Sequence, residues 1–159
     1  MSTPDIERLL ASVPTGLWIG GVERPGSSQF DVLDPSNDQV LISVANATAD
    51  DAIAALDAAC AVQAEWAATP ARERGEILRS VFETIIERAD DLAALMALGM
   101  GKVFAESMGE VKYGAEFFRW FAEEAVRIGG RFTASPAGNG RIIVTKSPVG
   151  PCYAITPWN

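Results

Sequence analysis

The residues best suited to chemistry form the stretch Ile155-Thr156-Pro157-Trp158-Asn159. The apolar run that leads into it from Cys152 is too short for a helix, so it predicts a buried strand that Pro157 ends. Ligands of α/β enzymes bind at the carboxyl ends of parallel strands. We therefore expect a ligand beside the Trp158 ring and the Asn159 side-chain amide, which can donate hydrogen bonds. The alternative is a turn asparagine that follows a core tryptophan.

Most other catalytic residue types are scarce. The sequence has no His, which excludes a His general base, a Ser-His-Asp triad and a His zinc site. The two cysteines, Cys60 and Cys152, have neither metal nor redox spacing, so we expect free, buried thiols and no metal site. Gly99-Met100-Gly101-Lys102 predicts a helix connection, because no strand precedes it and the third glycine of a dinucleotide fingerprint is missing.

Composition and charge limit the classes of partner that the protein is expected to bind. Hydrophobic residues make up 48% and charged residues 21%, as in a soluble globular protein. The net charge of −8 opposes binding to nucleic acid or to an anionic membrane, so neither is expected as a partner. No apolar run could cross a bilayer, and residues 1–8 lack the pattern of a secretory signal. A cytoplasmic location is the resulting expectation.

The elements that would position the carboxyl-terminal stretch begin with short strands. Residues 1–16 predict a lead-in with one helical turn, and Leu17–Val22 predicts a strand. Phe30–Leu33 and Val40–Val44 alternate around the turn residues 34–38, which is typical of a β-hairpin.

Four helices follow in the prediction. Thr48 and Asp51 resemble a capping box that starts a helix ending near Trp66. Thr69 as N-cap and Pro70 as first helical residue predict a second helix. An apolar stripe on that helix predicts a core face, formed by Ile77, Leu78, Val81, Phe82, Ile85 and Ile86. Asp90 or Asp91 is expected to cap a short third helix.

The fourth predicted helix is long, covering about 104–128 and ending at Gly129-Gly130. One face carries Val111, Ala115, Phe118, Ala122 and Ala125. Three further aromatic residues, Phe117, Trp120 and Phe121, indicate that the helix is covered on two sides. After a loop at 135–140, the apolar strand Arg141–Lys146 needs a partner strand.

The carboxyl-terminal stretch, with Lys146-Ser147-Pro148-Val149-Gly150 before it, resembles the I-x-P-W-N segment of the NAD(P)-dependent aldehyde dehydrogenase superfamily. The resemblance runs from about Leu17 to Asn159. It is strongest to the succinate-semialdehyde dehydrogenase branch, through Gly109-Glu110-Val111 and residues 120–125. The family has Glu in an E-x-G-K segment where this sequence has Gly99. The resemblance implies an α/β chain that is the amino-terminal part of a longer aldehyde dehydrogenase fold, ending in the first strand of the cofactor-binding sheet.

The resemblance also implies roles. Asn159 would donate a hydrogen bond to the oxyanion, and Ile155, Thr156, Pro157 and Trp158 would lie along bound NAD or NADP. The substrate would be a small aldehyde, with succinate semialdehyde the best match, oxidised through a thiohemiacetal on a Cys that this chain does not contain. The whole enzyme would be a homo-oligomer, a dimer or tetramer, and the chain alone would be inactive. The alternatives are another small-aldehyde dehydrogenase and a non-enzymatic helical interaction module.

These expectations divide the chain into four parts. Residues 1–16 are the lead-in, and 17–140 are the hairpin and helices of the cofactor-binding domain. Residues 141–148 are a projecting strand of the kind that joins subunits in the resembling family. Residues 152–159 are the first strand and the rim of the cofactor site.

Overall fold

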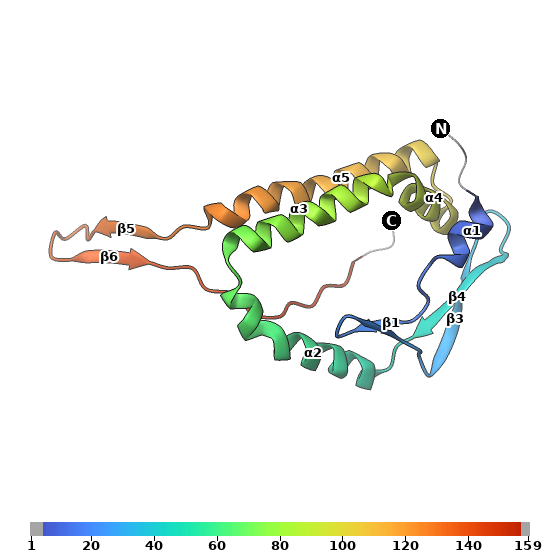
Figure 1. Cartoon of the computed structure of the whole chain (residues 1–159), viewed down its shortest axis with the longest axis horizontal. Coiled ribbons are helices and arrows are strands. Elements are labelled where there is room, and N and C mark those ends of the chain that lie inside the picture. The colour runs from blue at the N-terminus through green and yellow to red at the C-terminus, as the bar shows by residue number, and fades with distance from the viewer. Residues whose placement is uncertain (1–4, 157–159) are drawn as a thin grey trace.

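The structure, a computed structural model, describes residues 5–156 as helices linked to three separate two-stranded antiparallel sheets. The helices are α1 (Ile6–Ala11), α2 (Ala49–Ala68), α3 (Ala71–Glu87), α4 (Ala89–Met100), α5 (Phe104–Glu124) and the 3-10 helix η1 (Ala125–Arg127). The strands are β1 (Leu17–Ile19), β2 (Val22–Arg24), β3 (Ser28–Leu33), β4 (Val40–Asn46), β5 (Arg131–Ala134) and β6 (Arg141–Val144). Figure 1 shows α3 and α5 side by side, with the β5–β6 hairpin extending away from the helices.

The first two sheets are hairpins made by their turn residues. The predicted single strand at 17–22 is two strands, because Gly20 and Gly21 turn the chain with φ angles of 63° and 80°. The β3–β4 hairpin is confirmed, and its turn is closed by the Asp34 N–H donating to the Gln39 carbonyl at 2.8 Å. Hydrogen bonds from Ser36 and Asn37 to the Asp34 carboxylate lower its pKa.

Helix α2 begins with the predicted capping box. The Asp51 carboxylate accepts hydrogen bonds from the Thr48 N–H and hydroxyl at 2.8 and 2.7 Å, and the Thr48 hydroxyl oxygen accepts one from the Asp51 N–H at 3.2 Å. The predicted start of the next helix is shifted by one residue. Thr69 is the C-cap of α2 and Pro70 is the N-cap of α3, because the Thr69 N–H still donates to the Glu65 carbonyl of α2.

The core lies where α4 and α5 meet and where α5 packs along α3. Its central residues are small: Ala89, Ala93 and Val111, with Ile85, Leu92, Met96 and Met108 packed around them. The predicted face of α5 is confirmed in part, since Val111, Ala115 and Ala125 are buried while Phe118 is exposed. The predicted α3 stripe is also only partly covered, because Ile77 and Ile86 face solvent.

The β5–β6 hairpin supplies the partner that the apolar strand at 141–146 required. Arg131 pairs with Val144 and Ala134 with Arg141, and the predicted loop at 135–140 is the turn between the strands. Strand β5 was not predicted, because residues 131–134 alternate between polar and apolar over only four residues, which is a weak strand signal. The long helix ends as η1 at Arg127, just before Gly129-Gly130.

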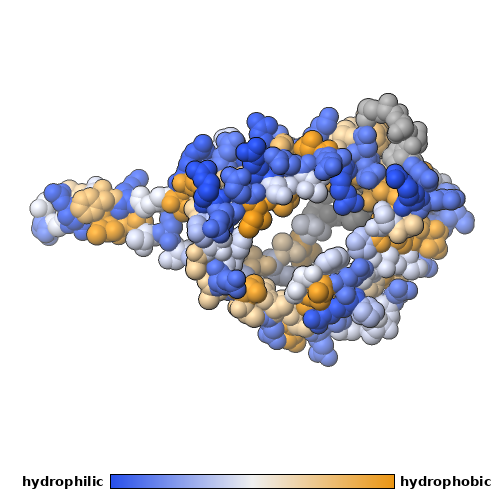
Figure 2. All heavy atoms as spheres, viewed as in Figure 1, coloured by the Kyte–Doolittle hydropathy of each residue, from blue (hydrophilic) through white to orange (hydrophobic). Residues whose placement is uncertain are grey.

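Two expectations, one about the carboxyl-terminal strand and one about the cysteines, are wrong within the described residues. Residues 152–156 form no strand there, because no neighbouring strand lies beside them to pair with. Cys60 and Cys152 are free thiols, as predicted, but both are exposed rather than buried. Apolar side chains are also exposed in several places on the face that Figure 2 shows. No helix within residues 5–156 has the length and apolar character of a membrane span.

Candidate functional site

The carboxyl-terminal stretch that carries the predicted chemistry is described as far as Thr156. Pro157, Trp158 and Asn159 lie outside the described residues, so their predicted roles stay predictions. Ile155 and Thr156 lie in an extended, exposed segment, and the Ile155 side chain is 83% exposed. Neither residue makes a hydrogen bond to another described residue. Their backbone donors and acceptors are therefore available to a ligand or to a neighbouring strand.

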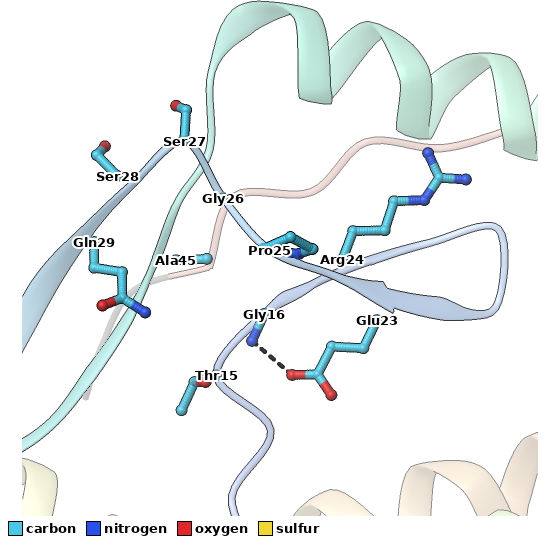
Figure 3. A pocket seen from close by; sticks show the side chains of 10 residues that line it. All are labelled: Thr15, Gly16, Glu23, Arg24, Pro25, Gly26, Ser27, Ser28, Gln29 and Ala45. Carbon is cyan, nitrogen blue, oxygen red and sulfur yellow. Dashed lines mark hydrogen bonds between the residues drawn. The ribbon is translucent and has the colours of Figure 1, made fainter.

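A polar hollow lies between the two amino-terminal hairpins, as Figure 3 shows. Its lining runs from Thr15-Gly16 through residues 23–29 to Ala45. The Glu23 carboxylate, the acid in this lining, accepts a hydrogen bond from the Gly16 N–H at 2.7 Å. Glycine is required at 16, because a Cβ there would lie 2.6 Å from the Arg24 carbonyl oxygen. The Glu23 carboxylate thus ties strand β2 to the residue before β1, which is a structural role.

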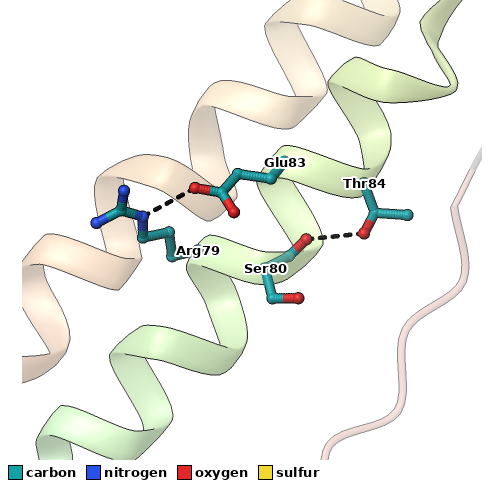
Figure 4. Close-up of polar contacts among 4 residues, drawn as sticks. All are labelled: Arg79, Ser80, Glu83 and Thr84. Carbon is teal, nitrogen blue, oxygen red and sulfur yellow. Dashed lines mark hydrogen bonds and ion pairs between the residues drawn. The ribbon is translucent and has the colours of Figure 1, made fainter.

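The outer faces of α3 and α5 carry arginines that are paired with glutamates. On α3, the Arg79 Nε donates to the Glu83 carboxylate at 2.9 Å, and the Thr84 hydroxyl donates to the Ser80 carbonyl at 2.9 Å (Figure 4). The Glu83 carboxylate raises the pKa of Arg79. On α5 and η1, Arg119 pairs with Glu116 and Arg127 with Glu124. These exposed i,i+3 and i,i+4 pairs support the helices, so Arg79, Arg119 and Arg127 are engaged within the chain.

The connection between α4 and α5 is tied by one further ion pair. Gly101 adopts a left-handed conformation with φ of 70° and ends α4, as the predicted helix connection requires. The Lys102 ammonium then contacts the Glu110 carboxylate on α5. The lysine of this segment is therefore engaged within the chain, and the segment does not form a phosphate site. Among residues 5–156, no group of His, Cys, Asp and Glu could hold a metal ion.

An aromatic surface on α5 was predicted only in part. Phe117, Trp120 and Phe121 are exposed together with Tyr113, whose ring meets that of Phe117 edge-on at 5.1 Å between centroids. These residues line one shallow hollow with Glu116. Tyr113 was missed, although its i, i+4 spacing to Phe117 was a readable signal. The side of α5 opposite its core face is thus apolar and uncovered within the described residues.

Comparison with known proteins identifies the family. Residues 22–159 match the model of the aldehyde dehydrogenase family. The chain is 55% identical over 120 residues, 76% of its length, to succinate-semialdehyde dehydrogenase of Paenarthrobacter nicotinovorans. It is 46% identical over 144 residues, 91% of its length, to the NADP(+) succinate-semialdehyde dehydrogenase of Escherichia coli (strain K12). The chain covers only 27% and 29% of the lengths of these relatives.

Solved structures agree with the fold. The crystal structure of succinate-semialdehyde dehydrogenase from Burkholderia pseudomallei superposes with a TM-score of 0.84 at 40% identity, over 89% of this chain and 30% of that one. A betaine aldehyde dehydrogenase from Staphylococcus aureus, in complex with NAD+, gives a TM-score of 0.78 at 29% identity, over 81% of this chain and 26% of that one. The described residues therefore have the architecture of one part of these larger enzymes. With a family match that spans most of its length, the chain belongs to the aldehyde dehydrogenase family.

Proposed function

We propose that the chain is the amino-terminal part of an NAD(P)-dependent enzyme that oxidises succinate semialdehyde to succinate. The observation that carries this proposal is the 55% identity to a succinate-semialdehyde dehydrogenase over 120 residues. The lower identity of 29% to a betaine aldehyde dehydrogenase makes that substrate the weaker candidate. Because the chain spans less than a third of each relative, it would contribute one portion of the catalytic machinery.

Asn159 is the residue to which we assign a catalytic role. When a thiolate attacks an aldehyde, the carbonyl oxygen gains negative charge. A side-chain NH₂ group can donate a hydrogen bond to that oxygen without carrying a charge or a proton that titrates near neutrality. An asparagine thus stabilises the oxyanion over the whole working pH range. Removal of one such donor typically lowers kcat by about 10²- to 10³-fold.

Ile155, Thr156, Pro157 and Trp158 are proposed to lie along bound NAD or NADP. The exposure and free backbone groups of Ile155 and Thr156 fit this role, because an extended segment can offer both an apolar wall and unpaired carbonyls. NAD(P) supplies the acceptor for the hydride that leaves the substrate. The role of this chain is to position the cofactor and to exclude water from that region, mainly through backbone and apolar contacts.

The nucleophile is not proposed to come from this chain. The resembling family carries its nucleophilic cysteine far downstream of the segment that residues 155–159 match, and neither Cys60 nor Cys152 lies at that position. The thiohemiacetal would therefore form on a cysteine outside these 159 residues. We expect the purified chain to show no NAD(P)-dependent turnover of succinate semialdehyde, and turnover above background would contradict the proposal.

Assembly into a homo-oligomer, a dimer or tetramer, is part of the proposal. The β5–β6 hairpin projects from the helices with all eight strand residues exposed, including Phe132 and Ile143. A two-stranded hairpin is marginal in water, so pairing with another subunit would stabilise it. The free thiols of Cys60 and Cys152 support a reducing location such as the cytoplasm.

A chimera tests the proposal directly. The matching 144-residue segment of the Escherichia coli relative would be replaced by this chain, and reduction of NADP by succinate semialdehyde would be measured. We expect an active enzyme in which Asn159→Ala lowers kcat by about 10²- to 10³-fold with little change in KM for NADP.

The matched control is Asn139→Ala, which removes an asparagine from the exposed β5–β6 turn and should leave kcat unchanged. A folded, NADP-binding chimera that is inactive before any substitution would reject the substrate assignment. Equal effects of the two asparagine substitutions would reject the role of Asn159. The non-enzymatic interaction module would be favoured only if the chimera bound no cofactor.

A further inference from the structure

A hollow of about 340 Å³ lies where the α2–α3 connection meets two later parts of the chain. Its walls come from the end of α2, the start of α3, the residue after η1 and the segment after β6. The lining residues are Trp66, Ala67, Arg74, Ile128, Lys146, Ser147 and Pro148. The hollow is separate from Ile155 and Thr156 and plays no part in the function proposed above.

The lining of this hollow contains two cations and no acid. Neither Arg74 nor Lys146 forms an ion pair within residues 5–156, and the lining contains no Asp or Glu. Arginines 79, 119 and 127 on the neighbouring faces are each paired with a glutamate. Arg72 and Lys112 are unpaired among the described residues, but neither lines this hollow. In a chain of net charge −8, two cations left together without an acid are a specific arrangement.

Both cations have donors to offer. The half-buried Arg74 guanidinium donates from one Nη to the Thr69 carbonyl, which holds the group in place at the α2–α3 turn. Its remaining N–H groups, and the three of the Lys146 ammonium, make no hydrogen bond to a described residue. An oxyanion would satisfy them with charge-assisted hydrogen bonds.

The remaining lining residues indicate what kind of anion would fit. Trp66, Ile128 and Pro148 are apolar, so a fully hydrated inorganic ion would gain nothing from them. A volume of this size matches the lower end of small-molecule sites. We propose that this hollow binds a small organic dicarboxylate with a short apolar body, whose two carboxylates pair with Arg74 and Lys146.

Titration calorimetry of the 159-residue chain with glutarate tests the proposal, with acetate as the single-carboxylate comparison. We expect saturable binding of glutarate that is tighter than that of acetate and that weakens as salt is added. Lys146→Gln should weaken glutarate binding by about tenfold, since it removes one charge-assisted pair. Lys146 makes no contact that the fold needs, so this variant should keep the helical circular dichroism signal of the parent chain.

The matched control is Lys112→Gln, which removes the same charge from an exposed position on α5 outside the hollow. It should leave glutarate binding unchanged. Arg74→Gln should abolish binding, but it also removes the bond to Thr69, so it is interpreted only if its circular dichroism is unchanged. Absence of saturable binding, or equal weakening by the Lys112 and Lys146 variants, would overturn the proposal.

Discussion

At the scale of single residues, Asp51 is where charge and local structure are coupled most closely. Its carboxylate accepts hydrogen bonds from both the N–H and the hydroxyl of Thr48, and these bonds lower its pKa, the backbone bond most strongly. A carboxyl whose pKa is lower in the folded state contributes stability above its ordinary pKa. That contribution is lost as the pH falls through the folded-state pKa.

We therefore expect the first turn of α2 to weaken as the solution is acidified below the ordinary carboxyl range. Asp51→Asn should remove much of this acid dependence, and Thr48→Ala should destabilise the helix by about 1 kcal/mol near neutral pH. Urea unfolding followed by helical circular dichroism across pH would measure both effects. Asp50→Asn is the control, since it changes the same helix turn without touching the capping box. If the two Asn variants show the same pH profile, the capping box is not the cause.

The sequence allowed this capping box to be predicted because all its partners lie within four residues. The environment of Cys60 and Cys152 was predicted wrongly for the opposite reason. Burial depends on which distant segments cover a residue, and an apolar neighbourhood in sequence does not supply them. The local pattern of Pro157, Trp158 and Asn159 indicated a ligand position, whereas their oxyanion and cofactor roles came from the family resemblance alone.

At the scale of elements, the packing of α3 on α5 depends on a glycine. Gly75 is buried, and a Cβ at this position would lie 2.8 Å from the Ala122 carbonyl oxygen of α5. A backbone atom cannot move aside as a flexible side chain can, so the two helices would have to separate. Gly75→Ala should therefore destabilise the chain by about 2 kcal/mol, even though alanine favours a helix.

Gly109→Ala on α5 is the matched comparison, because no atom lies within 4 Å of its added Cβ. It should stabilise the chain by up to about 1 kcal/mol, the gain in helix propensity alone. The midpoints of urea unfolding give the two changes in the free energy of unfolding, provided that its dependence on urea concentration has the same slope in both variants. Stabilisation by Gly75→Ala would show that α3 and α5 do not approach as closely as described.

Elements were predictable where their own residues determine them. The β3–β4 hairpin and the four helices after it followed from turn residues, caps and apolar spacing within each segment. Strand β5 did not, because residues 131–134 become a strand only by pairing with β6. The predicted strand from Cys152 shows the same dependence in reverse: its apolar pattern is present, but within residues 5–156 no strand lies beside it.

At the scale of the whole molecule, the chain exposes far more surface than its mass requires. Its accessible surface is 11744 Å², whereas a compact monomer of 16.9 kDa would expose about 7,700 Å². The difference has the size of an extensive subunit or domain interface. Much of it is apolar, since the α5 side chains Tyr113, Trp120 and Phe121 and the hairpin residue Phe132 are all more than half exposed.

Surface of this kind predicts self-association of the isolated chain. Contiguous apolar patches on soluble proteins mark places that another protein segment covers, and they bind hydrophobic dyes when left bare. We expect light scattering after gel filtration to show oligomers at micromolar concentration, with strong dye fluorescence. In the chimera with the Escherichia coli relative, dye fluorescence per chain should fall sharply, because the relative supplies the missing contacts. Trp120→Ser should reduce association of the isolated chain, whereas Ser80→Ala on the polar face of α3 should not. A monomeric chain that binds no dye would show that it buries this surface by itself.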